Sequence, residues 1–121
     1  MGKQLTTVEQ VTAAILTGER FFSFNVPRAN GTAGCRISIE NAYHWRTDAH
    51  GHRSVSHLRG YSALYFNQHG HKEVGYGKPC GPEGHVYDTP AAAAAALAAM
   101  ILTAVRRAKG TLTVRPRFIG A

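Results

Sequence analysis

Apolar residues recur along the chain with two different periods, and each period predicts a kind of element. Near the N-terminus, Val8, Val11 and Ile15 fall on one face of a helix. Just before them, Thr6 and Glu9 have the spacing of a capping box, in which the two side chains satisfy free backbone amides at a helix start. This segment is therefore expected to form a short amphipathic helix that packs on another part of the fold.

A period of two residues, typical of half-buried strands, follows in three places. Phe22–Val26, Cys35–Glu40 and Leu112–Arg115 each alternate apolar with polar side chains. Ala63–Phe66 is apolar on both faces, which is typical of a strand in the middle of a sheet. After a turn, Glu73–Tyr76 is expected to return beside it as a further strand.

The most regular pattern predicts a second helix near Pro90, a residue type favoured at the first helical position. Asp88 or Thr89 can cap it, and Ala91–Ala96 has the highest helix propensity available. The side chains expected on its buried stripe are Leu97, Met100, Ile101, Ala104 and Val105. The order helix, two hairpins, helix, strand predicts an α+β fold. We expect one domain over residues 1–121, with a single antiparallel sheet of about five strands and both helices packed on one face.

One stretch, residues 47–60, fits neither period. It holds few large apolar side chains but contains two arginines and three histidines. Loops longer than about 12 residues in compact domains are usually functional or disordered. The stretch is therefore expected to be a mobile, exposed basic loop.

The charge of the chain is large and unevenly distributed. Fourteen Lys and Arg against seven Asp and Glu leave +7 with neutral His, which indicates an anionic partner. Residues 28–78 carry a net +4, and residues 106–121 carry five bases and no acid. Residues 1–27 are neutral, and residues 79–105 carry −2. The excess thus belongs to the middle strands with their loop and to the C-terminal segment.

Arginines in these basic segments alternate with predicted core residues. Arg36 precedes Ile37 and Arg115 follows Val114, so both arginines should emerge on the sheet face away from the helices. Cations there can contact phosphates, and nearby aromatic rings can stack on bases. The alternative for each residue alone is that the aromatic rings belong to the core and the arginines only solvate the open face.

We therefore expect a small basic nucleic-acid-binding protein, encoded by a phage or mobile element, that uses this sheet face and the loop. The candidate nucleic-acid-binding residues are Arg36, Tyr43, Trp45, Arg46, Arg53, Arg59, Lys72, Arg115 and Arg117. A rival interpretation is a phage-coded inhibitor that binds an acidic protein surface in a host defence or transcription complex.

A second rival interpretation is a small metal-independent ribonuclease, which needs a general base, a general acid and a cation. Residues able to supply this chemistry are Glu40, His44, Arg46, His57, His69 and Lys72. The chain has no P-loop, Rossmann fingerprint, nucleophile elbow or zinc-protease helix, so an enzyme is less favoured and no catalytic residue is assigned.

Two His-Gly-His motifs, at residues 50–52 and 69–71, have a spacing that can present two imidazoles to one metal. Both lie in loop or turn sequence, where surface histidines are common. We therefore expect no metal and no other cofactor.

Two segments resemble known families. Thr7–Phe24 is similar to the start of small uncharacterised actinobacteriophage proteins, in which a short helix leads through a glycine into a Phe-rich strand and a β-meander. Tyr87–Pro90, followed by the alanine run, resembles the strand-to-helix junction of plant ethylene-response factors and integrase arm-binding domains. The first resemblance implies an α+β fold, and the second implies that the sheet reads DNA.

The cysteines and the apolar runs indicate the cellular compartment of the protein. Cys35 and Cys80 lack the close spacing of a zinc site or a disulfide scaffold. No secretory signal and no apolar run of membrane-span length is found, which together predicts a cytoplasmic protein without a membrane partner. The last strand and the Phe118–Ile119 tail can pair across a two-fold axis, so a homodimer and a monomer are both open.

Overall fold

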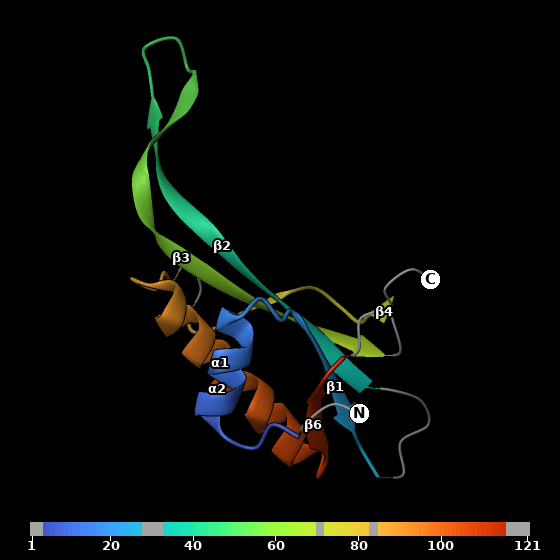
Figure 1. The fold of residues 1–121 in the computed structure, drawn as a ribbon. Helices are drawn as coiled ribbons and strands as arrows, with labels where there is room; N and C mark the ends of the chain where they lie inside the picture. The colour runs from blue at the N-terminus through green and yellow to red at the C-terminus, as the bar shows by residue number, and fades with distance from the viewer. Residues whose placement is uncertain (1–3, 28–32, 70–71, 83–84, 116–121) are drawn as a thin grey trace, which may run out of the picture.

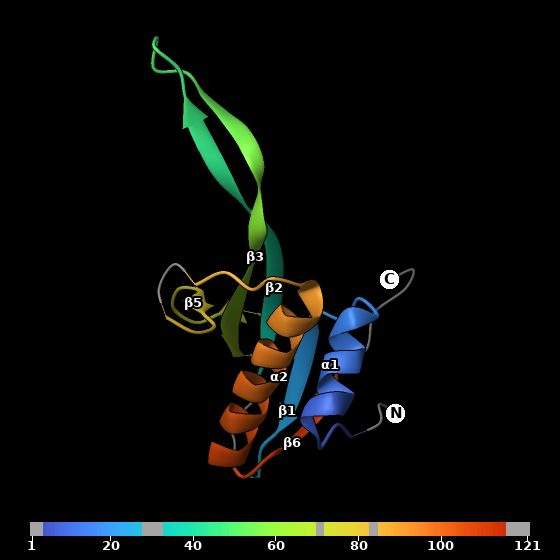
Figure 2. The ribbon, with the colours of Figure 1, turned by 90° about the vertical axis from the view of Figure 1, so that its left-hand side faces the viewer.

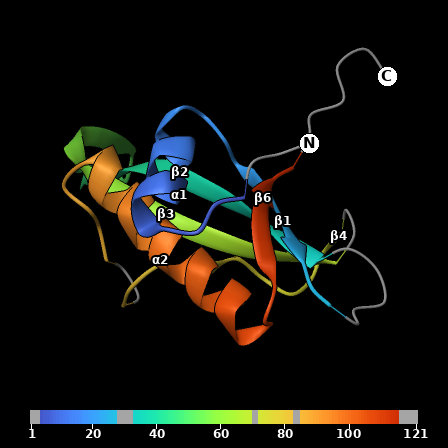
Figure 3. The same ribbon diagram turned by 60° about the horizontal axis from the view of Figure 1, so that its bottom comes forward.

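Six strands form one sheet, and two helices cover one of its faces (Figure 1 and Figure 3). The structure is a computed structural model that describes residues 4–27, 33–69, 72–82 and 85–115. The elements in chain order are α1 (Val8–Leu16), β1 (Phe21–Asn25), β2 (Ala33–Thr47), β3 (Arg53–His69), β4 (Lys72–Glu73), β5 (Lys78–Pro79), α2 (Pro90–Arg107) and β6 (Thr111–Val114). Neighbouring strands are antiparallel in the order β4-β3-β2-β1-β6, and β5 pairs with β3.

The predicted α+β class is confirmed, with a single antiparallel sheet and both helices on one face. The sheet has six strands where about five were expected, because Lys78–Pro79 adds a two-residue strand beside β3. The position inside the sheet expected for Ala63–Phe66 is confirmed, because β3 pairs with β2 on one side and with β4 and β5 on the other. That segment lies in β3, where Gly77 packs against the ring of Phe66 and covers part of its second apolar face.

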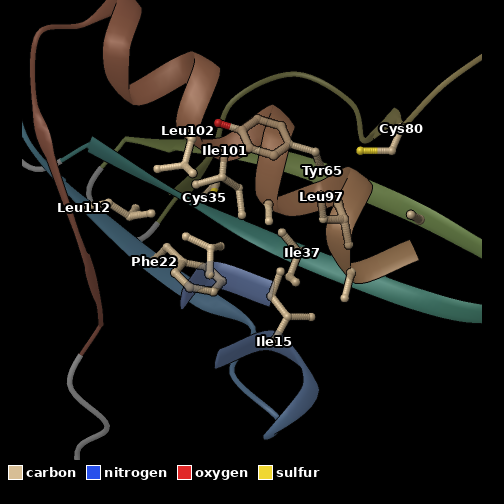
Figure 4. Packing of buried hydrophobic residues seen from close by; sticks show 14 of the residues in the cluster. Ile15, Phe22, Cys35, Ile37, Tyr65, Cys80, Leu97, Ile101, Leu102 and Leu112 are labelled. Carbon is tan, nitrogen blue, oxygen red and sulfur yellow. The ribbon is translucent and has the colours of Figure 1, made fainter. Parts of the chain in front are cut away.

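The sheet face that meets the helices carries the alternating apolar residues of the sequence. Phe22, Cys35 and Ile37 are at most 1% exposed. Figure 4 shows them gathered with Leu97 and Ile101 of α2. Burial of this apolar surface between the sheet and the helices supplies the main stabilisation of the fold.

The start of α1 differs by one residue from the prediction. The capping box is formed by Thr7 and Gln10, not by Thr6 and Glu9. The hydroxyl of Thr7 accepts from the backbone N–H of Gln10 at 3.2 Å, and the side chain of Gln10 accepts from the backbone N–H groups of Thr6 and Thr7. Both pairs have the required spacing, and the helix begins one residue later than expected, at Val8.

The α2 helix forms as predicted, with Thr89 as its cap and Pro90 at its first position. In the described part of the chain it is the one helix that is long and apolar enough to span a membrane by length and composition. Seven of its side chains are buried in the core, as is usual for the central helix of a folded domain.

The strand expected at Glu73–Tyr76 is much shorter in the structure. β4 ends at Glu73, and Gly75 turns the chain away with a φ of +78°. Val74 and Tyr76 are 58% and 95% exposed, so neither has a core to face. The chain returns to the sheet at β5 and at the hydrogen bond from the Cys80 N–H to the Ala63 carbonyl.

Two thiols and one tyrosine hydroxyl are buried in the core. Burial raises the pKa of Cys35 to about 12 and that of Cys80 to about 11. Burial also raises the pKa of Tyr65, with a smaller contribution from the neighbouring Cys35. The folded protein thus keeps both thiols protonated at neutral pH, which makes them poor nucleophiles and poor metal ligands.

Candidate nucleic-acid interface

The most prominent feature of the surface is a two-stranded arm formed by Ala42–Gly60. β2 and β3 continue past the ends of both helices and project from the rest of the molecule (Figure 1 and Figure 2). The basic loop expected at residues 47–60 is therefore wrong for most of its length, since β3 begins at Arg53. Only residues 48–52 connect the two strands.

Asp48 organises the turn at the tip of the arm. Its Oδ1 accepts from the backbone N–H groups of His50 and His52 at 2.8 and 2.9 Å, and its own N–H donates to the His52 carbonyl. Gly51 takes the positive φ of +82° that this turn requires. The acidic side chain of the arm is thus engaged by backbone amides.

Two register shifts determine which side chains share a face of the arm. Tyr43 pairs with Leu58 and Trp45 with Val55, so β3 has one extra residue, Ser56, between the two pairs. A second extra residue, Arg59, lies where the arm leaves the body. Bulges of this kind re-aim side chains in antiparallel pairs.

The first bulge collects the large apolar side chains of the arm on one face. Residues directly opposite each other in a ladder lie on the same side, and β2 alternates regularly, so Tyr43, Trp45, Val55 and Leu58 form one row. They are 38%, 55%, 49% and 45% exposed. We call this row the apolar face of the arm. It continues the core face of β2 beyond the region that the helices cover.

The opposite face of the arm is polar. His44 pairs with His57, their ring centroids being 4.5 Å apart, and Arg46 pairs with Ser54. Arg53, opposite Thr47, belongs to the apolar face, and its guanidinium lies 5.1 Å from the centre of the Trp45 ring. A cation at that distance interacts favourably with the aromatic face.

The arm carries a net positive charge, because its three arginines outnumber its one acid. Arg46, Arg53 and Arg59 are exposed, and none makes an ion pair within the described ranges. Asp48 is the single acid of residues 42–60, which also hold four histidines. The structure therefore brings together five of the predicted residues: Tyr43, Trp45, Arg46, Arg53 and Arg59.

The other predicted residues lie on the body. Arg36 is on the sheet face away from the helices, as expected, but it forms an ion pair with Glu73. Its guanidinium also lies 3.9 Å from the centre of the Phe66 ring. Glu40 lies on the same face of β2, so the charge of this open face is close to balanced.

Two more of the predicted cations also lie on the body. Arg115 follows β6, and its guanidinium lies 6.0 Å from the centre of the Phe21 ring, whose residue pairs with Arg36, so Arg115 is on the open sheet face as expected. Lys72 lies in the short edge strand β4, opposite His69. Arg117 lies outside the described residues, as does the Phe118–Ile119 tail considered for dimerisation.

Only three of the six side chains considered for a ribonuclease lie together. His57 and His69 lie in the same strand, separated by about 40 Å if it were fully extended. Glu40 accepts from the Ser38 hydroxyl, and Lys72 lies at the far end of the sheet with His69. Glu40, His69 and Lys72 therefore lie away from the arm, whereas His44, His57 and Arg46 share its polar face, with the rings of His44 and His57 4.5 Å apart.

The histidine motifs do not form a metal cluster in the described part of the chain. The rings of His50 and His52 are 6.4 Å apart, and no group of three or more His, Cys, Asp or Glu side chains there is arranged to hold an ion. The second motif lies partly outside the described residues.

Sequence reasoning missed Val55 and Leu58 as surface residues of the arm. Their spacing of three breaks the period of two, because Ser56 is a bulge. The sequence signal for a strand here was the presence of these two aliphatic residues in a segment otherwise rich in Ser, His and Arg.

Comparison of the chain with protein-family models, with curated proteins and with solved structures found no match. The resemblances to phage proteins and to sheet-based DNA-binding domains therefore remain predictions.

Proposed function

We propose that this protein binds nucleic acid through the arm, residues 42–60. The observation that carries the proposal is the combination, on one projecting hairpin, of three exposed arginines without acidic partners among the described residues and a row of exposed aromatic and aliphatic side chains. The open sheet face contributes less, because its charges are nearly balanced around Arg36 and Glu73.

The arm's arginines suit contact with phosphates. Guanidinium groups bind phosphate oxygens through paired hydrogen bonds, and release of counterions from the nucleic acid drives the association. A net charge of +7 on the whole chain adds long-range attraction. Such binding weakens linearly as the logarithm of the salt concentration rises.

The same electrostatics argue against a second copy of the chain as the arm's partner. Two molecules that each carry +7 repel one another, and the arm's own basic residues would lie close together in a symmetric arm-to-arm contact. An anionic polymer neutralises this charge and still offers apolar surface to the exposed side chains.

The test is a fluorescence-anisotropy titration of labelled DNA and RNA with the full chain at several salt concentrations. The test variant carries Arg46→Gln, Arg53→Gln and Arg59→Gln. Each lost phosphate contact costs about eightfold in affinity at about 0.1 M salt. The triple variant, which loses three contacts, should therefore bind about 100-fold to 1,000-fold more weakly. Its salt slope should fall by about 2.7.

The matched control removes the same charge from the end of α2, with Arg106→Gln, Arg107→Gln and Lys109→Gln. These residues are exposed, and Figure 2 shows the C-terminal end of α2 far from the arm. The control should lose much less affinity than the arm variant. Equal losses in the two variants, or no binding to DNA or RNA at about 50 mM salt, would overturn the proposal.

A further inference from the structure

The shape of the arm bears on which nucleic acid it fits. The arm is a two-stranded ribbon, and no other described part of the chain covers either of its faces between Tyr43 and Leu58. Its five paired residues from Tyr43 to Thr47 span about 17 Å when extended. The major groove of B-form DNA is about 12 Å wide and admits a two-stranded β-ribbon. The major groove of duplex RNA is too narrow for side chains to read.

The composition of the apolar face separates duplex from single-stranded partners. Single strands are held by aromatic rings on which bases stack. On this arm two of the four exposed apolar side chains, Val55 and Leu58, are aliphatic, and the ring of Trp45 is approached by Arg53. Aliphatic groups instead make close contacts with the methyl group of thymine, which points into the major groove.

We infer that the arm lies in the major groove of double-stranded DNA, with its apolar face toward the base edges and Val55 and Leu58 against thymine methyl groups. This inference rests on the proposed function and specifies its substrate. Arg46, Arg53 and Arg59 then serve the phosphates at the rim of the groove.

The experiment compares four probes of equal length with the full chain: duplex DNA, the same duplex with every thymine replaced by deoxyuracil, single-stranded DNA, and duplex RNA. Replacement by deoxyuracil removes only the methyl groups. The first duplex should bind most tightly, and the deoxyuracil duplex should bind about fourfold more weakly for each methyl group that is buried.

Val55→Thr supplies the residue-level test, because threonine keeps the branched shape favoured in strands and changes no charge. This variant should bind the two DNA duplexes with more nearly equal affinity while it keeps the salt slope of the unmodified protein. Val74→Thr is the matched control, since Val74 is 58% exposed and lies outside the arm. It should keep the full preference for thymine.

The outcomes separate this inference from the function on which it rests. Equal or tighter binding of single-stranded DNA or duplex RNA would overturn the duplex assignment and leave nucleic-acid binding in place. Indifference to deoxyuracil would overturn the orientation of the apolar face. Failure to bind any of the four probes would overturn both proposals.

Discussion

Val55 and Leu58 are three residues apart in β3, yet they lie on the same face of the arm. The extra residue Ser56 makes this possible, because it lets Val55 pair with Trp45 while Leu58 pairs with Tyr43. Without the bulge, a spacing of three would place the two side chains on opposite faces. The arm thereby presents an apolar face and a polar face.

Arg36 and Arg46 should differ in their effect on nucleic-acid binding although both were predicted from the sequence. Arg36 is occupied by Glu73 and by the Phe66 ring, whereas Arg46 is exposed without an acidic partner among the described residues. Arg46→Gln should reduce affinity about eightfold at about 0.1 M salt. Arg36→Gln removes the same charge and should change affinity by less than about twofold. Anisotropy titrations measure the affinities of both variants. Equal losses of affinity would mean that the nucleic acid also contacts the open sheet face.

Gly60, where the arm leaves the body of the protein, should not be replaceable by a larger residue without loss of stability. Its φ is +152°, and a Cβ built there would lie 2.6 Å from the Tyr87 carbonyl oxygen and collide with Val86. Gly60→Ala should therefore lower the free energy of unfolding by about 2–4 kcal/mol. Gly75→Ala is the control, because Gly75 also has a positive φ but has open space around it, and it should cost only about 1 kcal/mol. Chemical denaturation measures the free energy of unfolding of both variants. Similar losses of stability in the two would argue against close packing at Gly60.

Cys80 should make the stability of the protein depend on alkaline pH. Its pKa rises from an ordinary 9.0 to about 11 on folding, because burial disfavours the thiolate. The stability that it contributes is complete below about pH 9 and is lost as the pH rises toward 11, because only the unfolded chain releases the proton in that range.

The measurement is the difference in unfolding free energy between the unmodified protein and Cys80→Ala, followed from pH 8 to pH 11. This difference should shift by about 2 kcal/mol in favour of the variant as the pH rises. A difference that does not change with pH would mean that the thiol is exposed to water in the folded protein.

Much of the fold was predictable from the sequence, because the core follows simple periods. Phe22 and Phe24, two residues apart, are both buried, and Thr89 and Pro90 begin α2 as expected. The position of β2 at the centre of the sheet was not predictable, because pairing order depends on contacts between strands distant in the chain. The one-residue error at α1 arose because Thr6 and Thr7 both have a suitable partner three residues later.

The candidate site was predicted in part. Tyr43, Trp45 and Arg46 were recognised by residue type, but their place on a projecting hairpin was not. The strand from Arg53 to Gly60 was mistaken for a loop, since two bulges interrupt its alternation and no core residues mark its inner face. A strand that packs against nothing in its own chain gives little hydrophobic pattern to detect.

Trp45 gives the most direct test of the account, because it is the only tryptophan of the chain and lies on the apolar face of the arm with 55% exposure. Quenching of its fluorescence by acrylamide is measured in the full chain, with and without saturating duplex DNA. Acrylamide should quench Trp45 readily in the free protein and only weakly in the complex. A complex that forms but leaves the quenching of Trp45 unchanged would contradict it, because the DNA would then be bound away from the arm.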